Sequence, residues 1–114
     1  MQAMPVNHAL QTFSEKLSAE PFIVMITKLR FSSDLSQVEK FAINLIWFRD
    51  ENPIPLLRFD GSRFERMHVH YFFKRPITKE YHNKPLEFET IQTYWGRIRE
   101  NWHVYLAEFK ENYI

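Results

Sequence analysis

Four runs rich in β-branched and aromatic residues follow one another with only short polar connections between them, and this spacing constrains the fold more than any other feature. The runs cover Phe22–Phe31, Val38–Phe48, Ile54–Asp60 and Glu65–Arg75. Residues of these types favour β-strands. A parallel pair of strands needs a crossover of about a dozen residues or more, which none of these connections can supply. The sequence therefore predicts an antiparallel meander of four strands.

A short amphipathic pattern precedes these strands. Asn7 is a candidate N-cap, and apolar residues follow at spacings of three and four, namely Leu10, Phe13 and Leu17. This pattern predicts a short N-terminal helix that ends near Ala19.

A longer amphipathic pattern follows the strands, after a polar connection at Ile77–Pro85. Its apolar residues recur at alternating spacings of three and four, which predicts a helix from about Leu86 to near Glu111. At about 1.5 Å per residue, such a helix is longer than a four-stranded sheet is wide, and burial of its apolar overhang predicts a homodimer. The stripe that packs on the sheet contains Phe88, Ile91, Trp95, Ile98, Trp102, Tyr105 and Phe109.

The predicted architecture is one α+β domain over residues 1–114. It consists of a four-stranded antiparallel meander flanked by a short N-terminal helix and a long C-terminal helix packed on one sheet face. Because 45% of the 114 residues are hydrophobic and 17% are aromatic, the chain can fill one core. The apolar run Phe22–Ile26 is far shorter than the roughly 20 residues that span a bilayer. We therefore expect a cytoplasmic protein without membrane association.

Composition excludes several kinds of chemistry. The chain has no cysteine, so it has no disulfide, no thiolate metal site and no cysteine nucleophile. Its two glycines, Gly61 and Gly96, are too few and too far apart for a P-loop or a dinucleotide-binding loop. A formal net charge of +1 argues against attachment to nucleic acid through bulk charge alone. We therefore expect no cofactor, and any activity must depend on other side chains.

Side chains able to do chemistry gather in one predicted hairpin at residues 57–72. Gly61 permits a tight reversal there. If the loop has an odd number of residues, either three or five, even-numbered positions of both strands share one face. An even loop would place Arg58 beside Met67 and bury polar groups among apolar ones, which costs free energy. The odd loop is therefore predicted, and the shared face then carries Arg58, Asp60, Arg66, His68 and His70.

This constellation is typical of a metal-independent ribonuclease. His68 and His70 can serve as base and acid, since two residues at this spacing on a strand lie about 7 Å apart at Cα. Arg58 and Arg66 can hold a phosphate through forked hydrogen bonds. The predicted catalytic residues are thus His68, His70 and Asp60, and the predicted phosphate-binding residues are Arg58 and Arg66.

Two other interpretations of the same residues stay open. The face can be a solvated strand surface that cross-strand pairs stabilise. Alternatively, His68, His70 and Asp60 can ligate zinc or another divalent ion with one position left open.

The stretch Leu57-Arg-Phe-Asp-Gly, followed by Met-His-Val-His-Tyr-Phe, resembles the hairpin of the TumE-like toxins of prokaryotic toxin–antitoxin pairs and of related small uncharacterised proteins. The matching positions are Arg58, Asp60, His68 and His70. The resemblance implies a small prokaryotic α+β protein that acts on RNA and is neutralised by a DNA-binding antitoxin.

Two functions of different classes follow. The first is a small toxin-like protein that cleaves RNA phosphodiester bonds by metal-independent acid–base catalysis, with RNA, an antitoxin and a second copy as partners. The alternative is a non-catalytic homodimeric interaction module of unknown partner, in which the aromatic helix forms the interface.

Overall fold

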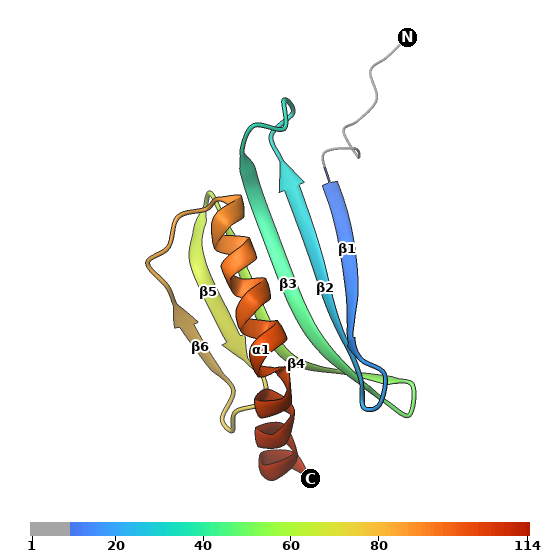
Figure 1. Cartoon of the computed structure of the whole chain (residues 1–114). Helices are drawn as coiled ribbons and strands as arrows, with labels where there is room; N and C mark the ends of the chain where they lie inside the picture. The colour runs from blue at the N-terminus through green and yellow to red at the C-terminus, as the bar shows by residue number, and fades with distance from the viewer. Residues whose placement is uncertain (1–9) are drawn as a thin grey trace.

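The computed structural model describes residues 10–114, which form a six-stranded antiparallel sheet and one long helix (Figure 1). Each strand pairs with the next along the chain, in the order β1-β2-β3-β4-β5-β6. The α+β class and the antiparallel sheet are confirmed, whereas the predicted number of four strands is wrong. The elements are β1 (Leu10–Ser18), β2 (Phe22–Phe31), β3 (Val38–Arg49), β4 (Asn52–Ser62), β5 (Glu65–Tyr71), β6 (Thr78–Tyr81) and α1 (Phe88–Tyr113).

The predicted N-terminal helix is wrong, because its described residues form strand β1. Asn7, the predicted cap, lies outside the described residues. β1 pairs antiparallel with β2, from Leu10 opposite Arg30 to Ser18 opposite Ile23. Of the three apolar residues only Phe13 and Leu17 fit a period of two, so the pattern gives little sign of a strand. Pairing along the edge of β2 satisfies the backbone polar groups of this segment. Tertiary context therefore decides the structure here.

The polar connection predicted at Ile77–Pro85 contains a further strand, β6. All four of its residues are exposed, and it pairs with β5 from Tyr71 opposite Thr78 to His68 opposite Tyr81. Since β6 buries neither face, it has no apolar alternation by which the sequence could reveal it.

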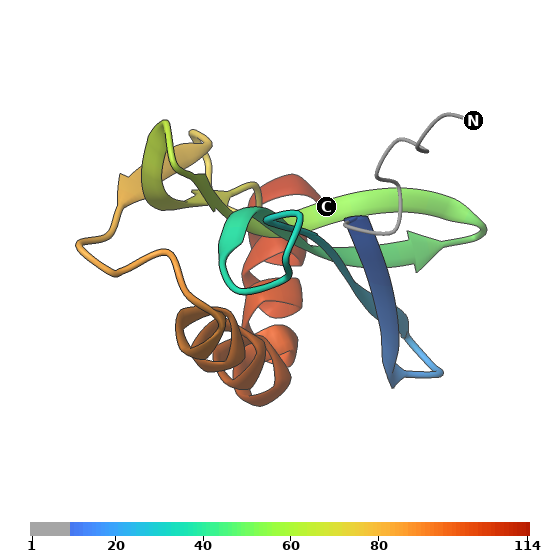
Figure 2. The same cartoon turned by 90° about the horizontal axis from the view of Figure 1, so that it is seen from above.

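The helix covers one face of the sheet, and Figure 2 shows α1 on that side of the curved sheet. β3 lies between β2 and β4. From Phe41 to Trp47 its odd-numbered side chains are buried, whereas its even-numbered side chains from Ala42 to Phe48 are only half-buried. The helix therefore covers only one face of β3. We call the face turned away from α1, which carries the even-numbered side chains of the central strands, the open face.

The contact face of α1 is shifted relative to the predicted stripe. Ile91 and Ile98 are fully buried as expected, but Phe88 is 40% exposed. Tyr94, which is not in the stripe, is buried and stacks on Phe59 with ring centroids 4.0 Å apart. Burial raises the pKa of Tyr94 to about 12. The Tyr94 hydroxyl lies 3.0 Å from Nδ1 of His82, which links the segment after β6 to the helix.

The end of α1 is attached to the connection between β5 and β6. The helix runs alongside the strands in Figure 1 instead of across them. In its last turn, Asn112 donates a hydrogen bond to the carbonyl of Phe73 at 2.9 Å, and the Tyr113 hydroxyl donates one to the carbonyl of Lys74 at 2.6 Å. The homodimer that an apolar overhang of this helix predicts stays a prediction. No helix in residues 10–114 combines the length and the apolar character that crossing a membrane requires.

Candidate functional site

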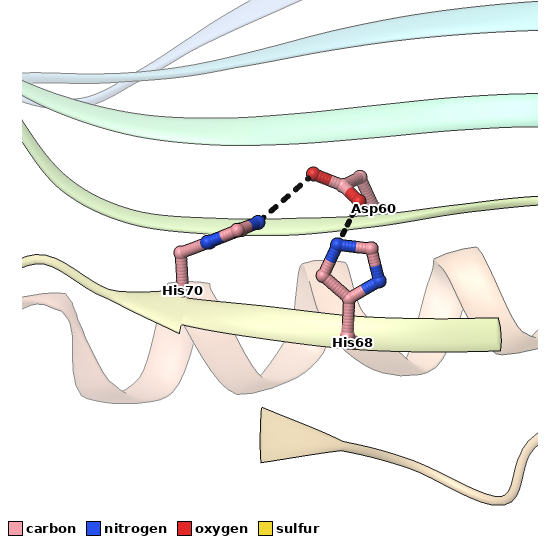
Figure 3. A group of neighbouring side chains, drawn as sticks. All are labelled: Asp60, His68 and His70. Carbon is pink, nitrogen blue, oxygen red and sulfur yellow. Dashed lines mark ion pairs between the residues drawn. The ribbon is translucent and has the colours of Figure 1, made fainter. Parts of the chain in front are cut away.

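The β4–β5 hairpin brings four of the five predicted site residues together on the open face. Arg58 pairs with His70 and Asp60 with His68, so the four side chains lie in two adjacent cross-strand pairs. Figure 3 shows both histidines extending from β5 toward Asp60 on β4. The predicted shared face of these four residues is therefore confirmed.

The predicted loop of three or five residues is wrong, although the hairpin still places these four residues on one face. Ser62 pairs with Glu65, which leaves a two-residue turn at Arg63 and Phe64. A two-residue turn alone would place even-numbered residues of β4 opposite odd-numbered residues of β5. The β-bulge between Asp60 and Ser62 shifts the register by one residue, so that even-numbered residues of both strands again share a face.

Gly61 is required for close packing at the bulge rather than for the reversal. Its φ is not positive, so the backbone conformation does not demand glycine. A Cβ atom added at Gly61 would contact Cε of Met67, and it would lie 2.6 Å from Sδ and 3.2 Å from Cα of that residue. The absence of a side chain thus lets β4 approach β5 where the register shifts.

Asp60 is the centre of the cluster. Its Oδ1 contacts Nε2 of His68, and its Oδ2 accepts a hydrogen bond from Nε of Arg58 at 2.8 Å. Nε2 of His70 lies 3.6 Å from the same Oδ2 (Figure 3). The carboxylate is thus shared among two imidazoles and one guanidinium.

His68 is buried at 1% exposure, and both of its ring nitrogens face oxygen atoms. Nδ1 lies 2.8 Å from the carbonyl oxygen of Arg66, which can only accept, so Nδ1 carries a hydrogen. Nε2 faces the Asp60 carboxylate. A contact between Nε2 and a carboxylate oxygen needs one hydrogen between the two atoms, so the pair of His68 and Asp60 holds a proton beneath the open face.

His70 presents an accepting nitrogen to the cluster. Its Nε2 lies 3.3 Å from Nη2 of Arg58, and a guanidinium has no acceptor, so Nε2 is the accepting nitrogen. Partial burial lowers the pKa of His70 below its usual value, and the positive charge of Arg58 lowers it further. The ring of Phe72 stacks on His70 with centroids 5.6 Å apart. His70 is therefore a neutral base at pH 7.

Arg66 stands apart from the other four predicted residues. It is exposed, and its guanidinium lies over the ring of Tyr81 at 5.0 Å from the centroid. Among the described residues, its side chain makes no hydrogen bond or ion pair with Asp60 or either histidine. Tyr81 itself lies opposite His68, with ring centroids 5.4 Å apart. Arg66 is therefore at the edge of the site.

An open pocket of about 390 Å³ extends from the cluster across β3 toward β2. Sequence reasoning missed its far wall, because Lys28 and Lys40 come from strands that precede the hairpin. Only the pairing of β2 with β3 and of β3 with β4 brings them near the site. The pocket is lined by Lys28, Lys40, Phe41, Ala42, Asn44, Arg58, Asp60, Gly61, Ser62 and Glu65.

The same cluster offers a set of possible metal ligands. One ligand atom each from Asp60, His68 and His70 lies within 4.8 Å of the others. However, Arg58 donates to the same Nε2 of His70 that would bind the ion, and its positive charge opposes a cation there. The donor set therefore fits a hydrogen-bonded network with a guanidinium better than a metal centre.

Comparisons of the chain with protein-family models, with curated proteins and with solved structures found no match. The resemblance of the hairpin to the TumE-like toxins therefore stays a prediction. Function has to be inferred from the chemistry of the open face.

Proposed function

We propose that the open face binds RNA through Arg58 and cleaves its phosphodiester bonds by acid–base catalysis that needs no metal ion. One observation carries this proposal. His68 and His70 lie side by side, with ring centroids 4.9 Å apart; His68 shares a proton with Asp60, and Nε2 of His70 accepts a hydrogen bond from Arg58. A base and an acid at neighbouring positions are what cleavage of RNA next to a 2′-hydroxyl requires.

The proposed reaction transfers two protons. Nε2 of His70 takes the proton of the 2′-hydroxyl, and the 2′-oxygen attacks the phosphorus. The bond from phosphorus to the 5′-oxygen breaks, and this oxygen takes the proton that His68 and Asp60 share. Because His68 is buried, Asp60 is the member of the pair that reaches the leaving group. The products are a 2′,3′-cyclic phosphate and a 5′-hydroxyl end.

Arg58 supplies the positive charge that the pentavalent phosphorane needs. Its side chain is 38% exposed, so a phosphate can reach the guanidinium from solvent. An incoming phosphate competes with Nε2 of His70 for the Arg58 donors and so frees the base. Arg66, at the edge of the site, contacts a neighbouring part of the RNA rather than the phosphate that is cleaved.

The cellular role that we propose is that of a toxin. Uncontrolled cleavage of RNA harms the cell that produces the enzyme, and the hairpin residues resemble those of the TumE-like toxins. A protein antitoxin that covers the open face would block Arg58 and His70 together, so neutralisation by such a partner is part of the proposal.

A cleavage assay tests this function. The wild-type protein is incubated with an end-labelled, unstructured RNA with and without EDTA, and the ends of the products are analysed. We expect cleavage with 2′,3′-cyclic phosphate ends that EDTA does not change. His70→Ala should lower the rate by about 10²- to 10⁴-fold, whereas His103→Ala, an exposed histidine on α1, should leave it unchanged. Loss of activity with EDTA would instead assign the histidines as metal ligands, and absence of any cleavage would refute the enzyme.

A second candidate function, the homodimeric interaction module, is supported by a different surface. Phe13 on β1 and Phe88 at the start of α1 are 44% and 40% exposed, and both rings pack edge-on against Trp95. Exposed aromatic clusters of this kind are typical of protein interfaces. In sedimentation, a dimer would have about twice the 13.9 kDa mass of the chain. A monomer at micromolar concentration would remove this candidate.

A further inference from the structure

We infer that the RNA substrate is single-stranded and is held at a second phosphate, next to the one that is cleaved, by Lys28 and Lys40. This inference rests on the proposed function and specifies the substrate of the same site. It is carried by the arrangement of strands that precede the catalytic hairpin.

Sheet register places both lysines on the open face in line with the cluster. Lys28 pairs with Ala42, and Ala42 pairs with Asp60, so these three residues form one row across β2, β3 and β4. Lys40 pairs with Ser62 in the adjacent row. Since neighbouring strands are about 4.8 Å apart, Lys28 lies about 10 Å from Asp60 at Cα. A phosphate above Ala42 is therefore within reach of a lysine side chain and adjacent to Arg58.

The space between the lysines and Asp60 is hollow because the residues there are small. Ala42 occupies the middle of the row and Gly61 lies beside it, and both line the open pocket of about 390 Å³. A larger side chain at Ala42 would fill the place where a backbone phosphate can lie.

The lysines are free to bind an anion, whereas the acidic groups of the pocket are already paired. Lys28 and Lys40 are exposed, and neither forms an ion pair within residues 10–114. Asp60 is shared by Arg58 and the histidines, and Glu65 accepts a hydrogen bond from Lys79 at 3.2 Å. The pocket thus presents unpaired positive charge, as a site for a phosphodiester requires.

The shape of the site favours a single strand. The rings of His70 and Phe72 stack with centroids 5.6 Å apart, and an unpaired base can extend this stack, whereas the bases of a duplex are already stacked on one another. A strand that passes Phe72, Arg58 and Ala42 in turn would present successive phosphates to the two cationic groups.

Two substrates of different length test the inference. A dinucleoside monophosphate carries only the phosphate that is cleaved, whereas a single-stranded hexanucleotide also fills the proposed second position. In the double variant Lys28→Ala/Lys40→Ala, kcat/KM for the hexanucleotide should fall about tenfold. For the dinucleoside monophosphate it should change less than twofold. The slope of log kcat/KM against log salt for the hexanucleotide should become shallower by about 0.7, the value for one phosphate of a single strand.

Lys110→Ala is the matched control, because this exposed lysine lies on α1, and it should alter neither substrate. If the double variant lost the same factor in kcat/KM on both substrates, or lost none on the hexanucleotide, the second phosphate position would be refuted. A duplex of the same sequence cleaved as fast as the single strand would overturn the preference for single strands.

Binding separates failure of this inference from failure of the proposed function. If the wild-type protein cleaves no RNA, the affinity for a fluorescent hexanucleotide is measured instead. A tenfold weaker affinity in the double variant would preserve the phosphate site while refuting catalysis. An unchanged affinity would refute both.

Discussion

The Nη2 atom of Arg58 lies 3.3 Å from Nε2 of His70 and donates a hydrogen bond to it across the β4–β5 pair. This contact disfavours protonation of the imidazole, because the accepting lone pair is in use and a positive charge lies beside it. It also makes Arg58 responsible for two properties, the affinity for phosphate and the protonation of the base. A substitution at Arg58 therefore has effects that can be measured at His70.

The pH dependence of cleavage should follow the pKa of His70. Because burial and Arg58 lower this pKa below the usual 6.5, the neutral base predominates above that lowered value and is lost only as the pH falls through it. The acidic limb of kcat/KM should therefore lie below pH 6.5. Removal of the Arg58 charge in Arg58→Gln should raise the pKa and move this limb to higher pH. NMR titration of the His70 ring gives the same midpoint independently, and an unshifted midpoint in Arg58→Gln would contradict the assignment.

Arg58→Lys should keep the positive charge but lose the planar guanidinium, which donates several hydrogen bonds in fixed directions. A lysine ammonium cannot follow the geometry by which Nε binds Asp60 while Nη2 reaches His70. Phosphate binding, measured by calorimetry, should be weaker than in the wild type and stronger than in Arg58→Ala. Full recovery by lysine would show that only the charge matters.

The two histidines should differ in their contribution to stability. His68→Ala removes a buried ring and leaves the carbonyl of Arg66 without its donor, so we expect a loss of about 1–3 kcal/mol in the free energy of unfolding. His70 is partly exposed, and His70→Ala should cost less than about 1 kcal/mol. Urea denaturation followed by circular dichroism measures both values, and equal costs would contradict the burial difference.

Gly61→Ala should destabilise the hairpin by about 1–3 kcal/mol, because the new Cβ collides with Met67. Part of the cost should disappear in the background of Met67→Ala, which removes the flexible end of the opposing side chain but not its Cα. A double-mutant cycle measures this coupling, and additive effects would show that the strain arises elsewhere.

Ile98→Ala should lower the free energy of unfolding by about 2–5 kcal/mol, because this side chain is fully buried between α1 and the sheet. Val104→Ala, on the exposed side of the same helix, should change it by less than about 0.5 kcal/mol. Thermal denaturation of both variants tests which face of α1 packs on the sheet. Similar costs at the two positions would contradict the packing.

In this protein, the strands that bury many side chains could be predicted from the sequence, and the strands that bury few could not. β2 begins and ends at the predicted residues, Phe22 and Phe31, because its odd-numbered side chains are buried and its composition favours strands. That Arg58, Asp60, His68 and His70 share one face was predictable because a shift by one residue would bury charged groups. Their cross-strand pairs were not, since the predicted loop would pair Arg58 with Arg66 rather than with His70. The hidden elements are the two edge strands.

β1 and β6 bury too little to produce a strand pattern, and only their pairing with β2 and β5 defines them. For the same reason Lys28 and Lys40 could not be placed near the cluster, since a pocket that spans three strands depends on the register of all of them. The bulge beside Gly61 could not be predicted, because the sequence pattern shows only which residues share a face. A loop with an odd number of residues and a two-residue turn followed by a bulge give the same arrangement of faces.

Alternation along β5 has a consequence for the kinds of sequence change that this protein tolerates during evolution. Met67, Val69 and Tyr71 point toward the helix, and His68 and His70 point toward the open face. A point substitution at His70 leaves the core residues in place, so new chemistry can arise on the open face at little cost in folding. A deletion of one residue in β5 would exchange the two sets and damage both core and site. Lineages that retain this hairpin should therefore vary in residue type at the site while its strands keep a fixed length.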